Sequence, residues 1–121
     1  MKTIIFDMNP LGSFEISSEV YRRYYLERFN KKIYFYTRLK GKLYKRVDNL
    51  DELFKLKNRV ITFKDLGKEV CEIPFDSNTR VCPIDQSYEE DELLQKIISE
   101  LGEKASWKNS DIRIIEVEDD F

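Results

Sequence analysis

The sequence contains no histidine, and this absence removes a large part of enzyme chemistry. Without histidine the chain forms neither a serine-histidine-aspartate triad nor a cysteine-histidine pair, and it lacks the commonest zinc ligand. Glycine is also scarce: Gly12, Gly41, Gly67 and Gly102 lie far apart, and each suits a turn or a helix end. The sequence therefore excludes histidine-dependent catalysis and a glycine-rich phosphate loop.

Cys71 and Cys82 are the only cysteines, and their spacing matches neither a structural zinc site nor a redox pair. Because Cys71 falls inside an apolar strand pattern, we expect a buried, reduced thiol there. No apolar run approaches the roughly 20 residues that cross a membrane, and no signal-like segment opens the chain. These absences predict a cytoplasmic protein that does not enter a membrane.

Charge of both signs is present but segregated along the 121 residues, with a net charge of -2. Residues 22–46 hold ten basic side chains and one acidic one, whereas residues 85–121 hold twelve acidic and four basic ones. These two segments can complement each other within one chain or between two copies, so the oligomeric state stays open. With 41% hydrophobic residues, the chain 1–121 is expected to fold as a single domain with a real core.

Capping residues and apolar spacing predict a tyrosine-rich helix and a short helix. The tyrosine-rich helix runs from Ser17 or Ser18 to about Phe29 and presents aromatic side chains on one face. A capping box at Asn49 predicts the short helix, which extends to about Lys57.

The clearest element in the chain is an amphipathic helix that begins with a capping box, Ser87 and Glu90, and closes at Gly102. The strand predicted over residues 111–117 is expected to dock on its apolar stripe, and another strand is predicted over residues 2–6. The stripe consists of Leu93, Leu94, Ile97, Ile98 and Leu101.

Residues 33–47 alternate between apolar and polar side chains, which predicts a β-hairpin. A three-residue loop that pairs Leu39 with Leu43 gathers the aliphatic side chains on one face. A second hairpin is predicted over residues 60–73, with Gly67 in a left-handed conformation. The polar face and tip of the first hairpin display Tyr34, Tyr36, Arg38, Lys40, Lys42, Tyr44 and Arg46.

Strands outnumber helices in this pattern, and they occur as hairpins. A turn is also predicted at residues 76–79, followed by a further short strand at residues 80–82. The predicted fold class is therefore α+β, with a largely antiparallel sheet built from hairpins, two main helices and one short helix.

The tyrosines and cations of the first hairpin are the candidate binding residues. Such side chains stack on bases and neutralise phosphates, and tyrosine and arginine are also favoured in protein interfaces. If the helix ending near Phe29 or the acidic helix after Ser87 covers this face, the same tyrosines belong to the core. The pattern leaves these three interpretations open.

Carboxylates are the one plentiful catalytic residue type. Asp7, Asp85 and residues 89–92 suggest a Mg²⁺ site, although acidic residues also gather at helix N-termini for electrostatic reasons. Residues 116–120 form an acidic run, which is read as a solvated end or, alternatively, as a mimic of DNA.

Two segments carry a resemblance. Residues 12–21 (GSFEISSEVY) resemble the N-terminal part of a group of small bacteriophage and prophage proteins. Residues 83–106, which end in ELGEKAS, together with residues 112–120 (IRIIEVEDD) resemble the C-terminal part of that group, in which ELGEKASG and LKIVEIPDD recur. Trp107 stands where a glycine is usual in that group. The resemblance covers about half of the chain and brings no catalytic residues. It implies a phage-encoded accessory protein that acts in the cytoplasm by binding a host or defence component.

The leading hypothesis is therefore a non-enzymatic accessory protein that binds a host or defence protein without a cofactor or a metal. The first alternative is single-stranded nucleic-acid binding through the hairpin of residues 33–47. Further alternatives are a sponge for a nucleotide or another small molecule and a carboxylate-metal enzyme.

Overall fold

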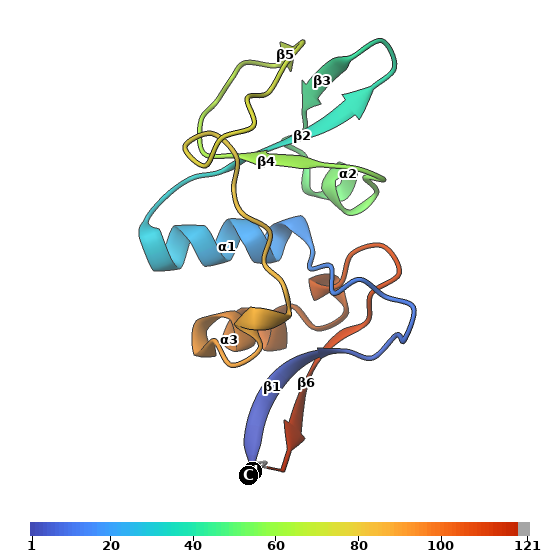
Figure 1. The fold of residues 1–121 in the computed structure, drawn as a ribbon, viewed down its shortest axis with the longest axis vertical. Coiled ribbons are helices and arrows are strands. Elements are labelled where there is room, and N and C mark those ends of the chain that lie inside the picture. The colour runs from blue at the N-terminus through green and yellow to red at the C-terminus, as the bar shows by residue number, and fades with distance from the viewer. Residues whose placement is uncertain (119–121) are drawn as a thin grey trace.

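The computed structural model describes residues 1–118, which form three α-helices and two antiparallel sheets (Figure 1). This is the α+β fold class that the sequence predicted. A two-stranded sheet pairs β1 (Lys2–Asp7) with β6 (Ile112–Val117), and a four-stranded sheet has the order β4-β2-β3-β5. The strands of the second sheet are β2 (Tyr34–Leu39), β3 (Leu43–Arg46), β4 (Val60–Thr62) and β5 (Glu69–Val70). The helices are α1 (Ser18–Phe29), α2 (Leu50–Phe54) and α3 (Glu92–Leu101).

Helix α1 lies between the four-stranded sheet and α3 (Figure 1). Its bounds match the prediction, because Ser17 is the N-cap and Asn30 ends the helix in the left-handed conformation with φ 53°. The core-facing side chains Val20, Tyr21, Tyr24 and Tyr25 are buried, as expected for the tyrosine-rich face. The two sheets therefore pack on opposite sides of a helical layer.

The start of α3 differs from the prediction. The helix begins at Glu92, and the carboxylate of Asp91 accepts the backbone N–H of Leu94 at 3.0 Å, so Asp91 is the N-cap. The predicted capping box at Ser87 is wrong, because Asp85 binds the backbone N–H and the hydroxyl of Ser87 and so forms a separate 3₁₀ turn, Gln86–Tyr88. The predicted end is confirmed, since Gly102 has a φ of 58°.

The apolar stripe of α3 packs into the core as predicted. Its residues Leu94, Ile97 and Ile98 are buried, and Ile112 of β6 is buried in the same cluster. Ile115 lies opposite Ile4 in the β1–β6 pairing and therefore on the other face of that sheet. Strand β6 thus docks through alternate residues only.

The register of the first hairpin is confirmed, with Leu39 opposite Leu43 and positive φ angles at Gly41 (80°) and Lys42 (61°). The predicted second hairpin is wrong: β4 pairs with β2 and β5 pairs with β3, so the two strands lie at opposite edges of one sheet. The chain between them crosses one face of the first hairpin instead of turning tightly. At residue 80 the predicted strand is reduced to an isolated bridge with Thr62.

The prediction of a buried thiol at Cys71 is also wrong, since both cysteines are exposed. Strand β5 contains only Glu69 and Val70, so the chain leaves the sheet before Cys71 is reached. The apolar pattern that predicted burial of Cys71 thus extends past the end of β5, and for this reason it did not predict the environment of Cys71 correctly.

The segregated charges meet in part within the chain. Arg23 pairs with Glu100 and Arg28 with Asp91, each at 3.0 Å, and these contacts join α1 to α3.

Of the acidic run at residues 116–120, Asp119 and Asp120 lie outside the described residues. None of the helices within residues 1–118 has the length and apolar character needed to cross a membrane.

Candidate binding groove at the hairpin tip

Four of the seven candidate residues lie around one cavity of about 550 Å³, which we call the hairpin-tip groove. One wall is the tip of the β2–β3 hairpin and the other is the segment that follows β5. The residues contributed by the hairpin include Arg38, Lys40, Lys42 and Tyr44. The remaining candidates Tyr34, Tyr36 and Arg46 do not line it.

Tyr36 is fully buried, so of the interpretations that the sequence left open, the covered face holds at this residue. Its hydroxyl donates a hydrogen bond to the carbonyl oxygen of Gly67 at 2.8 Å and accepts the N–H of Leu66 at 2.9 Å. The loop between β4 and β5 therefore covers Tyr36. Neither α1 nor α3, the helices considered from the sequence, covers it. Burial raises the pKa of the Tyr36 phenol above its ordinary value.

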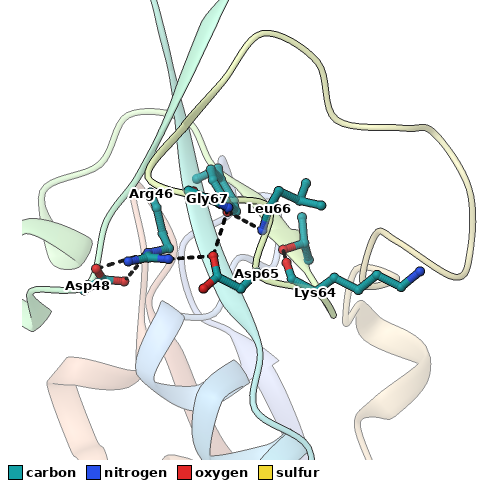
Figure 2. A network of polar contacts seen from close by, with 8 residues as sticks. Arg46, Asp48, Lys64, Asp65, Leu66 and Gly67 are labelled. Carbon is teal, nitrogen blue, oxygen red and sulfur yellow. Dashed lines mark hydrogen bonds and ion pairs between the residues drawn. The ribbon is translucent and has the colours of Figure 1, made fainter.

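Arg46 is held by the same loop. Figure 2 shows its guanidinium between the carboxylates of Asp48 and Asp65, at 3.1 Å and 2.6 Å respectively. Asp65 also accepts the N–H of Gly67 at 3.0 Å, and this bond together with the Arg46 contact lowers the pKa of its carboxyl group. We call Tyr36, Arg46, Asp48, Asp65 and Gly67 the loop clamp. Arg46 thus serves the fold, since its charge is already paired.

Tyr34 occupies a third position, away from both the groove and the loop clamp. Its ring is half-buried, and the ammonium of Lys32 lies 5.5 Å from the ring centroid. The candidate residues therefore separate into a groove set, a clamp set and this single tyrosine.

The opposite wall of the groove contains residues that the sequence analysis did not single out. Phe75 is 89% exposed, and the guanidinium carbon of Arg80 lies 3.5 Å from the centre of its ring. Arg80 also donates hydrogen bonds to the carbonyl oxygens of Ile73 and Pro74, which fix its orientation. The sequence did contain a signal that Phe75 is exposed. Phe75 lies between Pro74 and the turn at residues 76–79, and a residue in such a position is outside the sheet.

The groove carries an excess of positive charge. Within residues 1–118, the side chains of Arg38, Lys40 and Lys42 form no hydrogen bond or ion pair, and all three are exposed. Arg80 adds a fourth cation to the lining, whereas Glu72 is its single carboxylate. Free cations beside an exposed aromatic ring attract anionic groups and offer them an apolar contact.

The carboxylates considered for a metal site have other partners. Asp7 accepts backbone N–H groups from Asn9, Phe14 and Asp111 at 2.9 to 3.1 Å and so joins three segments. Burial raises the pKa of Asp7, but these hydrogen bonds outweigh burial and leave it below its ordinary value. In the part of the chain that the structure describes, no three cysteine or acidic side chains are grouped to hold a metal ion.

The groove defines a class of candidate site: a basic, partly aromatic surface built from a hairpin tip and a loop. Comparison with protein-family models, curated proteins and solved structures finds no match to this chain.

Proposed function

We propose that the chain is a non-enzymatic binding protein that captures an acidic surface of a protein partner in the hairpin-tip groove. The observation that supports this proposal is the set of three exposed, unpaired cations, Arg38, Lys40 and Lys42, within the described part of the chain. The bacteriophage resemblance stated from the sequence makes a host or defence protein the proposed partner class.

Two features suit the groove to such a partner. Like-signed charges around one concavity raise the rate of encounter with an oppositely charged surface. Phe75, stacked with Arg80, is an exposed aromatic group of the kind that anchors protein interfaces. The loop clamp holds the covering loop on the hairpin, so less ordering is needed when a partner binds.

The experiment compares wild type with the triple variant Arg38→Glu/Lys40→Glu/Lys42→Glu in capture from a bacterial host extract. The control reverses three exposed lysines elsewhere, Lys57→Glu/Lys96→Glu/Lys104→Glu, and changes the formal charge by the same amount and in the same direction.

We expect the hairpin variant alone to lose the captured protein, and purified partner to bind it at least about tenfold more weakly than wild type. Equal loss in both variants would show a general charge effect and would remove the groove from the proposal.

A second candidate function is single-stranded nucleic-acid binding, which Phe75 favours because its ring, although stacked with Arg80, remains 89% exposed and can contact a base. The test measures binding of labelled 20-mer DNA and RNA at about 50 and 200 mM salt, with Phe75→Ala as the variant. Micromolar binding that collapses with salt and with the substitution supports this function. No binding at the lower salt concentration eliminates it.

A further inference from the structure

A second cavity, of about 620 Å³, lies where the start of β4 meets the segment before α1 and the chain around residues 81–85. It shares Phe75 and Arg80 with the hairpin-tip groove and is otherwise lined by different residues. We call it the Arg59 cavity after the cation in its wall.

The guanidinium of Arg59 is held in one orientation. Its central carbon lies 3.8 Å from the centre of the Trp107 ring and 4.8 Å from that of Tyr21. Two of its N–H groups donate to the hydroxyl of Ser18 at 3.0 Å and to the carbonyl oxygen of Ile16 at 2.6 Å. A guanidinium has five N–H donors, so these two bonds leave others that a ligand in the cavity could use, in addition to the interaction with the Tyr21 hydroxyl.

Arg59 is a desolvated cation that forms no direct ion pair in residues 1–118, although the nearby carboxylate of Glu15 favours its charged form. Burial lowers its pKa to about 10, which shows the cost of keeping this charge away from water. The aromatic faces offset only part of such a cost, and a buried charge is normally matched by an opposite one. An anion in the cavity would provide that match.

The carboxylates in the cavity wall are already engaged. Glu15 pairs with Lys108 at 4.0 Å, Asp76 accepts two backbone N–H groups of its own turn, and Asp85 binds Ser87. The second cation in the wall, Arg80, is bonded to backbone carbonyl groups and likewise forms no ion pair in the described chain. Arg59 and Arg80 therefore form no direct ion pair within residues 1–118, and an anion that enters the cavity would provide one.

The rest of the lining is mostly apolar, apart from Ser13, Ser77 and Cys82, and includes flat aromatic surfaces. The buried members are Phe14, Tyr21, Ile61, Val81, Ile84 and Trp107. Cavities of this size with an apolar lining and a few oriented polar groups are typical of small-molecule sites.

We propose that the Arg59 cavity binds a small aromatic acid, with its anionic head group on the Arg59 guanidinium and its ring against the apolar wall. The head group is a carboxylate or a phosphate, since both accept from the planar donors of arginine. This site does not depend on the function proposed for the hairpin-tip groove.

The test titrates the full chain with 4-tert-butylbenzoate, 4-tert-butylphenyl phosphate and the uncharged 4-tert-butylbenzamide, using calorimetry. Trp107 is the single tryptophan of the chain, is 6% exposed and lines the cavity, so its fluorescence reports binding at this place. We expect at least one of the two acids to bind at least about tenfold more tightly than the amide and to change the Trp107 emission.

Two cysteine variants locate the site without touching Arg59. Cys82→Tyr places a ring in the cavity from an exposed position, and Cys71→Tyr is the matched control because Cys71 is exposed but lines only the hairpin-tip groove. We expect Cys82→Tyr to weaken acid binding at least about tenfold and Cys71→Tyr to leave it unchanged.

Equal affinity for acid and amide, no binding of either acid at millimolar concentration, or equal binding by the two cysteine variants would each overturn the proposal. The triple charge reversal at the hairpin tip should leave acid binding unchanged, so the two proposals fail independently.

Discussion

The hydroxyl of Tyr36 donates a hydrogen bond to the carbonyl oxygen of Gly67 at 2.8 Å, and this contact ties β2 to the loop between β4 and β5. Figure 2 shows the ion pair between Arg46 and Asp65 in the same loop. Because Tyr36 and Arg46 are neighbours across the β2–β3 pairing, one cross-strand pair holds the whole loop. Two residues predicted to bind a partner therefore shape the surface beside the groove instead.

Replacing Tyr36 should lower stability. Tyr36→Phe removes the acceptor of the Leu66 N–H and the donor to Gly67, and we expect a loss of about 1 to 3 kcal/mol in the free energy of unfolding. Tyr36→Ala should cost about 3 to 5 kcal/mol, because it also empties a fully buried site. Urea denaturation measures both. The half-buried Tyr34 provides the control, since Tyr34→Phe should change stability by less than about 0.5 kcal/mol. Wild-type stability in Tyr36→Ala would refute the loop clamp.

Gly12 should not tolerate a side chain. A Cβ atom at this position would lie 2.0 Å from a carboxylate oxygen of Asp7, so Gly12→Ala forces Asp7 to release its backbone partners. The expected loss is about 1 to 3 kcal/mol by thermal or urea unfolding. Ser13→Ala, one residue further on, is the control and should have an effect below about 0.5 kcal/mol. Similar stability of both variants would contradict the close contact.

The charge of Asp7 should make stability depend on pH in the acid range. Its pKa in the folded state is lowered from the ordinary value of 3.8, so its contribution is present above that value and is lost as pH falls through the folded pKa. We expect Asp7→Asn to be less stable than wild type at neutral pH and the difference to shrink below about pH 3. Urea unfolding across this range measures it. A difference that grows on acidification would reverse the sign of the argument.

Alanine substitution at the start of α3 should lower stability at Asp91 but hardly at Ser87. Asp91→Ala removes the helix cap and the acceptor of the Tyr24 hydroxyl at 2.7 Å, so we expect a loss of at least about 1 to 2 kcal/mol. Ser87→Ala should cost less than about 0.5 kcal/mol, because Ser87 is exposed and caps no α-helix. Measured helix content and unfolding free energy distinguish them. A larger effect at Ser87 would restore the capping box expected from the sequence.

Local sequence signals predicted the elements that depend on neighbours in the chain. The end of α1 follows from Asn30 and the end of α3 from Gly102, because caps act within one helical turn, whereas Ser17 stands at the N-cap of α1 without a side-chain capping bond. The hairpin register follows from the loop length and from the alternation that sets Leu39 opposite Leu43. Asp91 was missed as a cap because Ser87 and Glu90 have the spacing of a capping box, whereas Asp91 is followed three residues later by Leu94.

What the sequence alone determined about this protein is its α+β class, most of its helices, one hairpin and the basic character of residues 38–42. Only the tertiary structure decided that β4 and β5 lie at opposite edges of the sheet, that Tyr36 is buried, and that Phe75 and Arg80 complete the groove. The reason is physical. An alternating strand has the same sequence whether its polar face meets water or a loop, and the choice depends on contacts between residues far apart in the chain.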